Sequence, residues 1–322
     1  MIRITRRVAL ALPALLPAAA NAQWAPARPL RFVVPFAAGG ATDIVARVLS
    51  EPMGERLGQA VAVENRTGAG GNVGVENVVR SAPDGLTLLM GTTGTLTINP
   101  HLYANMGFNP LTDLAPVSLA FGTDHVLIVN PNVAAQTAQE FLALVRAQPG
   151  RLSYGSGGNG TSTHTVAELF KLVARVEIQH VPYRGSAPAL NDTVAGNVQV
   201  MLDQIASALP QIQAGRVRAL AVTGARRHPA LPNVPTVAEI GLAAAEATSW
   251  GAVMAPSGTP APIVERLNVV VRECLALQPV RDRLTQVGAE ALSSSPAELA
   301  AYLRAETEKW GRVVREARIT VN

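Results

Sequence analysis

Cysteine, aromatic residues and long apolar runs are scarce in this sequence, and each shortage excludes a class of protein. Its 322 residues include one cysteine, Cys274, so no disulfide can form within the chain. Cys274 lies in a helical pattern with no histidine-and-acid pattern around it, which predicts a small buried residue rather than a nucleophile. Aromatic residues make up only 4% of the chain, so its glycine-rich loops lack a stacking platform for an aromatic ligand. No run after the N-terminus is long and apolar enough to span a membrane.

The basic character of the chain comes mostly from its N-terminus. The formal net charge is +4, but "MIRITRRVALALPALLPAAANA" holds three arginines and no acid. A charged head, a short apolar stretch and a small-x-small ending predict a signal peptide over residues 1–22, cut after Ala22. Arg6 and Arg7 also permit twin-arginine export. Cleavage leaves 24 basic and 23 acidic residues, so we expect no nucleic-acid partner.

Strand-like and helical patterns alternate along the rest of the chain. This alternation predicts an α/β protein with parallel strands flanked by helices, and the pattern occurs in two similar runs. The expected strands are 30–36, 60–65, 86–92, 125–131, 152–156, 178–183, 198–203 and 217–224. The expected helices are 43–57, 73–82, 138–148, 163–174, 186–196, 206–215 and, toward the C-terminus, 261–277, 279–288 and 296–317.

Two glycine-rich loops follow expected strands, and the second fits a dinucleotide-binding fingerprint. "GSGGNG", residues 155–160, matches G-x-G-x-x-G. A dinucleotide fold also needs an acid at the end of the next strand, whereas Glu177 begins that strand. Ser156 has a glycine directly before it, so the segment is not the G-x-S-x-G of a serine hydrolase. Both enzyme interpretations therefore fail on context.

An anion-binding site explains the glycines of the two loops better than either enzyme does. The first glycine loop (residues 36–43, "FAAGGATD") and the second glycine loop (residues 156–164, "SGGNGTSTH") each lead from a strand into a helix. Helix N-termini attract anions, and hydroxyls of Thr161, Ser162 or Thr163 can add hydrogen bonds. We therefore expect a carboxylate between the two loops. Each loop alone is equally well explained as a tight structural turn.

Single polar residues give weaker signals. The pattern Thr165-Val166-Ala167-Glu168 fits a capping box, so we expect Glu168 to cap a helix. Asp43 falls in the first turn of a helix, where acids are favoured in any case. Asp203 ends an apolar strand, where a carboxylate faces a ligand cleft or a hinge. The remaining candidates are loop-bracing arginines and five histidines without metal-ligand spacing: Arg66, Arg184, His101, His125, His164, His180 and His228.

These segments, in this order, resemble the Bug family (Bordetella uptake gene product, TctC-like), the periplasmic receptors of tripartite tricarboxylate transporters. The resemblance covers residues 28–322. It implies a two-lobe periplasmic-binding-protein fold (type II, Venus flytrap), each lobe a mixed, mainly parallel sheet flanked by helices. Lobe 1 would hold residues 23–124 and 251–322, and lobe 2 residues 125–250. The matching segments include "RPLRFVVPFAAGGATDIVAR", "VAVENRTGAGGNVG", "APDGLTLLMGTTGTLTINP", "HVPYRGSAPALNDTVAGNVQVMLD" and "PNVPTVAEIGL".

The resemblance also implies a ligand and partners. The ligand would be a small carboxylated molecule, the partners two membrane subunits, and the receptor a monomer without a cofactor. The family usually has proline before the glycines of the first loop, whereas this chain has Ala37 and Ala38, so this loop lacks that rigid turn. The ligand-binding residues would be Phe36, Ala38, Gly39, Gly40, Asp43, Gly91, Thr92, Thr93, Ser156, Gly157, Gly158, Asn159, Gly160, Thr161, Thr163, His164 and Asp203.

Two alternatives stay open at this point. The same fold serves an orphan sensor that hands its closed form to a signalling partner, and a neighbouring sensor-kinase gene would favour that function. An exported oxidoreductase or hydrolase is the other alternative. It lacks a nucleophile–base set, a metal set and a sound cofactor fingerprint in the sequence.

Overall fold

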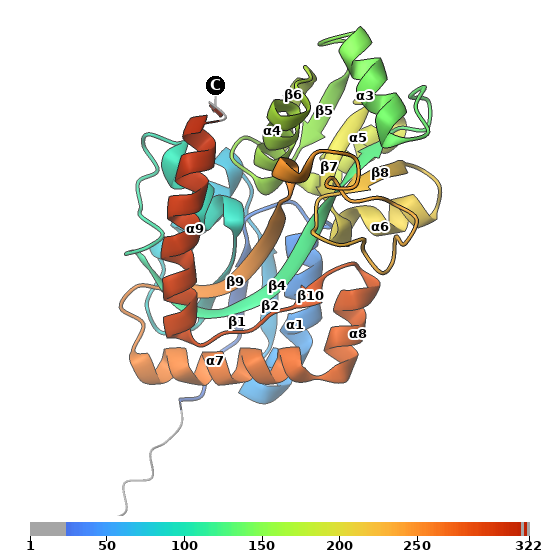
Figure 1. The fold of residues 1–322 in the computed structure, drawn as a ribbon. Helices are drawn as coiled ribbons and strands as arrows, with labels where there is room; N and C mark the ends of the chain where they lie inside the picture. The colour runs from blue at the N-terminus through green and yellow to red at the C-terminus, as the bar shows by residue number, and fades with distance from the viewer. Residues whose placement is uncertain (1–23, 317–318, 321–322) are drawn as a thin grey trace, which may run out of the picture.

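The computed structural model describes residues 24–316 and 319–320 and shows one mixed sheet flanked by helices (Figure 1). The expected signal peptide lies outside the described residues. Among the residues described, no helix combines the length and apolar character needed to cross a membrane.

The first segment of the sheet combines parallel and antiparallel strands. Strand β1 (Leu30–Val34) pairs in parallel with β2 (Val61–Asn65) and β3 (Thr87–Thr92). Strand β9 (Thr248–Pro256) lies between β3 and β4 (Leu114–Val129) and runs antiparallel to both. The short β10 (Glu290–Ala291) adds to β4. Thus the centre of this segment comes from a part of the chain far beyond β1, β2 and β3.

The second segment of the sheet shares β4 with the first. Residues 114–124 of β4 pair with β9, whereas residues 125–129 pair with β7 (Val200–Gln204). Strand β8 (Arg218–Val222) also pairs with β4. Strand β5 (Ser153–Ser156) lies between β7 and β6 (Gln179–Pro182), parallel to both. One continuous strand therefore joins the two segments.

The helices divide between the two segments (Figure 1). Helices α1, α7 and α8 cover the first segment, and α3 to α6 surround the second. Helix α9 runs beside the first segment toward the second. The helix bounds are α1 (Ala41–Leu57), α2 (Asn72–Val79), α3 (Ala138–Ala147), α4 (Ser162–Ala174), α5 (Ser186–Ala195), α6 (Ile205–Gln213), α7 (Ala261–Ala276), α8 (Gln278–Gln286) and α9 (Pro296–Glu316). Shorter turns are η1 (Ala69–Gly71), η2 (Gly94–Ile98), η3 (Asn99–His101) and η4 (Ala243–Ala245).

The expected α/β fold is confirmed, and the strands that alternate with helices are parallel as predicted. The connecting strands β4 and β9 are antiparallel, because they carry the chain between the segments rather than through a strand–helix–strand crossover. Only the end of β4 was expected from the sequence. Cys274 is buried in the apolar core between α1, α7 and β1, as its helical context predicted.

Helix α9 belongs to two apolar cores. Leu299 and Leu303 near its start pack with the core around β3 and β9. Trp310 and Val314 near its end belong to the core that contains Phe170 of α4. The lobe boundaries expected from the sequence stay a prediction. Helix α9 was assigned to lobe 1, but it also packs against residues of the expected lobe 2.

Candidate functional site

A small cavity lies where the two glycine loops meet. Its volume is about 20 Å³, which is room for about one water molecule. Residues from both segments of the sheet surround it. They are Phe36, Gly40, Ala41, Thr42, Asp43, Thr92, Gly157, Thr161, Ser162, Thr163, Ser186 and Gln204.

Four helices begin at this cavity. Gly40 precedes α1, Thr161 precedes α4, Gly185 precedes α5 and Gln204 precedes α6, and none of these residues caps its helix with a side-chain hydrogen bond. The first N–H groups of a helix have no partner within the helix. Each helix also carries partial positive charge at its N-terminus. The cavity therefore offers several hydrogen-bond donors and a positive potential to a small anion.

The first glycine loop is held by Asp43. Its carboxylate accepts hydrogen bonds from the Gly39 N–H and the Arg47 guanidinium, each at 2.9 Å, and from the Asn65 amide at 2.9 Å. Burial raises the pKa of Asp43, but the hydrogen bonds outweigh burial and hold it below its ordinary value. Asp43 is therefore a bound carboxylate, and its negative charge is matched by Arg47.

The second glycine loop satisfies its own glycine N–H groups. Gly157 N–H donates to Thr163 Oγ1 at 2.8 Å, and Gly158 N–H donates to Ser156 Oγ at 3.1 Å. Gly160 N–H donates to His164 Nδ1 at 3.2 Å. These glycines shape the loop, and the donors that remain for a ligand belong to the first turn of α4.

The two segments of the chain touch across the rim of the cavity. Ala37 N–H in the first glycine loop donates to the Arg184 carbonyl at 3.3 Å. Gly185 has φ +136°, and a Cβ there would lie 2.9 Å from Ala37 N, so only glycine fits this approach. On the other side of the cavity, Tyr103 Oη donates to the Asn159 carbonyl at 2.7 Å. These contacts join the two segments near the cavity, whose volume of about 20 Å³ leaves no room for a ligand larger than water.

Asp203 lies behind the cavity rather than in its lining. Its buried carboxyl accepts hydrogen bonds from Ser207 Oγ at 2.6 Å and from the Gln204 N–H at 2.9 Å. Ser186 donates a further side-chain hydrogen bond. Burial raises the pKa of Asp203 to about 7 despite these bonds. Because Ser186 and Gln204 line the cavity, Asp203 fixes two of its walls.

The cavity lining and the residues expected from the sequence overlap in part. The expected residues that line it are Phe36, Gly40, Asp43, Thr92, Gly157, Thr161 and Thr163. The expected residues outside the lining are Ala38, Gly39, Gly91, Thr93, Ser156, Gly158, Asn159, Gly160, His164 and Asp203. The lining also holds Ala41 and Thr42, which belong to the first glycine loop, and Ser162, whose hydroxyl was expected to add a hydrogen bond; Ser186 and Gln204 are the lining residues that were not expected. Ser186 begins α5 after β6, and Gln204 ends β7 directly before α6. Both therefore lie at a junction between a strand and a helix, as the glycine loops do.

The capping role expected for Glu168 is wrong. Helix α4 begins at Ser162, so Thr165 lies inside the helix and Glu168 lies beyond its first turn. Glu168 instead accepts hydrogen bonds from Tyr154 Oη at 2.5 Å and from Lys171 Nζ at 2.7 Å. Among the residues described, no group of three histidine, cysteine or acidic side chains is placed to hold a metal ion.

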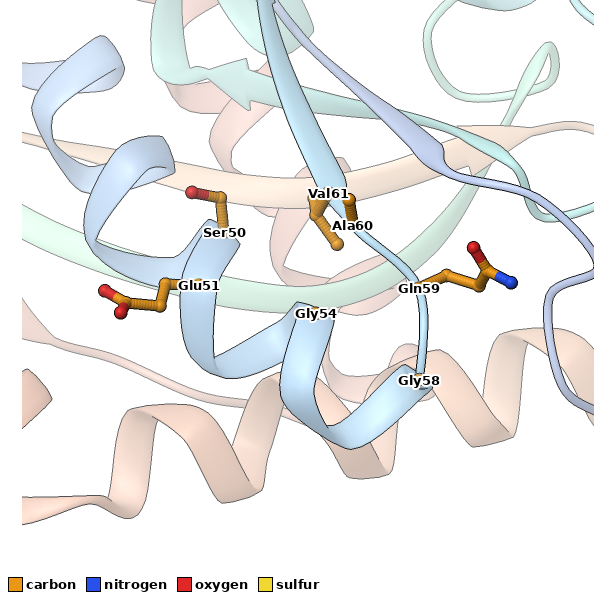
Figure 2. Close-up of a pocket in the computed structure, with 7 residues that line it drawn as sticks. All are labelled: Ser50, Glu51, Gly54, Gly58, Gln59, Ala60 and Val61. Carbon is orange, nitrogen blue, oxygen red and sulfur yellow. The ribbon is translucent and has the colours of Figure 1, made fainter.

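A larger hollow, of about 440 Å³, lies on the surface of the first segment. Figure 2 shows its lining at the end of α1 and the start of β2: Ser50, Glu51, Gly54, Gly58, Gln59, Ala60 and Val61. The hollow contains the C-terminal end of α1, which does not attract an anion, and Glu51, which pairs with Arg283 at 3.9 Å. Its lining comes from the first segment alone. The small cavity between the segments is therefore the better candidate site.

Comparison with known proteins gives a consistent result. The family model of the tripartite tricarboxylate transporter family receptor, TctC, matches residues 45–319. BugT of Bordetella pertussis is 36% identical over 292 residues, which cover 90% of each chain. R. palustris Rpa4515 with adipate has a TM-score of 0.89 and 37% identity, covering 92% of this chain and 99% of that one. MatC (Rpa3494) from Rhodopseudomonas palustris with bound malate has a TM-score of 0.86 and 35% identity, covering 90% of this chain and 99% of that one.

Proposed function

Because this chain belongs to the tripartite tricarboxylate transporter family receptors, TctC, we propose that it is a periplasmic receptor that binds a small carboxylate between its two segments. The family and its structural neighbours are solute-binding proteins, and we assign this chain no catalytic step. It would act as a monomer and deliver its ligand to two membrane subunits of a tripartite transporter.

The convergence of four uncapped helix N-termini on one cavity carries this proposal. Among the described residues of the lining, Asp43 alone has an ionisable side chain, and it is already bound by Arg47. A ligand carboxylate would therefore be held by backbone N–H groups and by hydroxyls. The lining places hydroxyls of Thr42, Thr92, Ser162 and Ser186 at the cavity. The hydroxyls of Thr161 and Thr163 also line it, but they are bonded within the second glycine loop, where Thr161 Oγ1 donates to the Gly158 carbonyl at 2.7 Å and lies 3.0 Å from Thr163 Oγ1.

Aliphatic dicarboxylates are the class that the comparisons favour. Two proteins of similar sequence and structure have been solved with adipate and with malate. Both are small and flexible, and both present carboxylate groups to N–H and hydroxyl donors. The scarcity of aromatic side chains in the lining, where Phe36 is the only one among the described residues, fits an aliphatic ligand.

Binding would be coupled to closure of the two segments. The cavity has room for about one water molecule, so the ligand would enter an open state. Contacts from α1 on one side and from α4, α5 and α6 on the other would then favour the closed state. The closed state presents the surface that the membrane subunits recognise.

A thermal-shift screen tests the proposal directly. The protein from Gln23 onward is unfolded and refolded to remove carried-over ligand, and then heated with mono-, di- and tricarboxylates, amino acids, aromatic acids or NAD. A ligand present at about a hundred times its dissociation constant adds about 2.7 kcal/mol to the free energy of unfolding. We expect a higher midpoint with adipate, malate or a close dicarboxylate. A shift with NAD alone, or with no acid, would refute the carboxylate receptor.

A further inference from the structure

Three aromatic rings are stacked directly behind the second glycine loop. The His164 and His180 rings lie 4.2 Å apart between centroids, with 13° between their planes. The Tyr154 ring continues the stack at 4.8 Å from His180. The rings come from α4, β6 and β5. None of the three side chains is among the residues that line the cavity.

Each imidazole is bonded to the second glycine loop. His164 Nδ1 accepts the Gly160 N–H at 3.2 Å. His180 Nε2 and Ser156 Oγ lie 2.6 Å apart, and Ser156 Oγ in turn accepts the Gly158 N–H at 3.1 Å. The two rings thus fix both ends of the turn that leads into α4. The N-terminus of α4 is one of the four that begin at the cavity.

The bond from Gly160 determines the protonation state of His164. A backbone N–H can only donate, so the Nδ1 atom that receives it carries no proton. His164 is then the neutral tautomer with its proton on Nε2. Protonation of Nδ1 would place two donors against each other and break the bond. The shape of the loop therefore depends on a neutral imidazole.

The charged groups around the stack do not favour protonation. Burial lowers the pKa of His164 to about 4; Glu168 opposes this effect and Lys171 adds to it. Burial also lowers the pKa of His180 to about 3, and the charge of Lys171 lowers it further, as would a proton on His164. Asp203 lies on β7, which packs against α4, but its carboxyl is held by Ser207 and Gln204.

We propose that His164 and His180 are positioning residues that hold the second glycine loop in its ligand-binding shape, and that His164 does so only while its imidazole is neutral. The inference rests on the proposed carboxylate site. It adds a stack of rings outside the cavity to the groups that determine ligand affinity.

Two substitutions at residue 164 test two roles of His164 separately, its role as a hydrogen-bond acceptor and its ability to be protonated. His164→Phe keeps a ring in the stack but removes the acceptor of the Gly160 N–H. His164→Asn places an oxygen near the position of Nδ1 and cannot be protonated at neutral or mildly acidic pH. His180→Phe and His180→Gln form the equivalent pair for the Ser156 contact.

Isothermal titration with adipate and with malate, from pH 8 to pH 4, gives the first readout. We expect His164→Phe to weaken binding about tenfold at pH 7, since a buried N–H loses its partner. His164→Asn should bind like the wild type at pH 7 and keep more of its affinity as the pH approaches 4. The carboxyl groups of the ligand titrate in the same way with every variant. A difference in pH profile between variants therefore reports protonation of the protein. Equal affinity of His164→Phe and wild type, or identical pH profiles of His164→Asn and wild type, would overturn the proposal.

Nuclear magnetic resonance without ligand gives the second readout. The ¹⁵N shifts of the His164 ring should show an unprotonated Nδ1 at pH 7, and Gly160 amide exchange should rise about tenfold in His164→Phe. His228→Phe is the matched control, because His228 Nδ1 accepts the Ala230 N–H at 3.2 Å in an exposed loop. It should leave Gly160 unchanged.

The two readouts distinguish the two failures. Wild-type protein that binds neither the two acids nor any other carboxylate would refute the proposed function. A protonated Nδ1 at pH 7, or a Gly160 amide that ignores His164→Phe, would refute the positioning role whatever the ligand is.

Discussion

The hydroxyl of Tyr103 donates a 2.7 Å hydrogen bond to the carbonyl of Asn159, joining the segment after η3 to the second glycine loop. These two residues are distant in sequence and belong to opposite sides of the cavity. Burial raises the pKa of Tyr103, so the hydroxyl keeps its proton and stays a donor. The contact exists only when the two sides are together.

Removing this hydroxyl should weaken the closed state. We expect Tyr103→Phe to lower the affinity for the carboxylate about fivefold, chiefly through faster dissociation, because one hydrogen bond contributes about 1 kcal/mol. Stopped-flow dissociation measures the rate. Tyr183→Phe is the control, since its hydroxyl bonds Asp192 at 2.6 Å within the second segment. Equal dissociation rates in Tyr103→Phe and Tyr183→Phe would contradict a role in closure.

A methyl group at Gly157 should disturb the site more than one at Gly40. A Cβ at Gly157 would lie 3.2 Å from Ser186 N and 3.3 Å from the Gly185 carbonyl carbon, both backbone atoms. A Cβ at Gly40 would meet Ser186 Cβ at 3.8 Å, an ordinary contact. Gly157→Ala should therefore weaken carboxylate binding about tenfold, as overpacking costs about 1 to 3 kcal/mol.

Titration calorimetry on the two alanine variants tests this difference, with circular dichroism to confirm that both are folded. Weaker binding in Gly40→Ala than in Gly157→Ala would contradict the crowding argument. Gly160 is less suitable for this test, because its φ of +79° strains any other residue and a Cβ there would collide with Asn99 Oδ1.

The buried carboxyl of Asp203 should make part of the folding stability depend on pH. Its pKa is about 7 in the folded protein, against the ordinary value of 3.8 for an aspartate in the unfolded chain. The folded state therefore binds more protons between these values, so this group lowers stability as the pH rises from about 4 to 7. Asp203→Asn should become steadily more stable relative to wild type over that range. Urea unfolding at five pH values measures the difference in unfolding free energy between Asp203→Asn and the wild type. A difference that stays constant or shrinks as the pH rises would contradict this prediction.

Glu306 should be important for stability because it joins α9 to the sheet. One oxygen of its buried carboxylate accepts from the Trp250 indole at 3.0 Å and from the Trp310 indole at 3.1 Å. Glu306→Ala leaves two buried N–H groups without an acceptor and should cost about 3 kcal/mol of unfolding free energy. Glu308→Ala, an exposed position on the same helix, is the control. Chemical unfolding measures both variants. Equal unfolding free energies for Glu306→Ala and Glu308→Ala would show that the indole contacts contribute little to stability.

The sequence predicts the helices, strands and turns that are determined by residues close together along the chain. Strand, glycine turn and helix recur with clear periodicity, so most elements and the first turns of α1 and α4 were expected. The crossing strands β4 and β9 were largely missed, because their pairing joins residues more than a hundred positions apart. The start of α4 was expected at residue 163 and lies at Ser162, whereas the capping-box pattern at Thr165 was misleading, since Thr161 precedes the helix.

The sequence predicts only those residues of the site that belong to a recognisable loop. Ser186 and Gln204 were not expected because no glycine motif marks them, although each lies where a strand leads into a helix. The stack of His164 and His180 depends on α4 packing over β6, and no local pattern indicates that two histidines will meet. His164 was expected to contact a ligand, whereas the structure places it on the Gly160 N–H.

The position of β9 between β3 and β4 determines the order in which the newly made chain can fold. Synthesis through Val222 supplies every strand of the second segment, which can therefore close its sheet early. The first segment then has β3 and β4 with unpaired edges and no strand to join them. Its strands cannot be joined until residues 248–256 have reached the compartment in which the chain folds, and β10 follows only at residues 290–291. The part of the sheet whose synthesis starts first is thus the last to be finished.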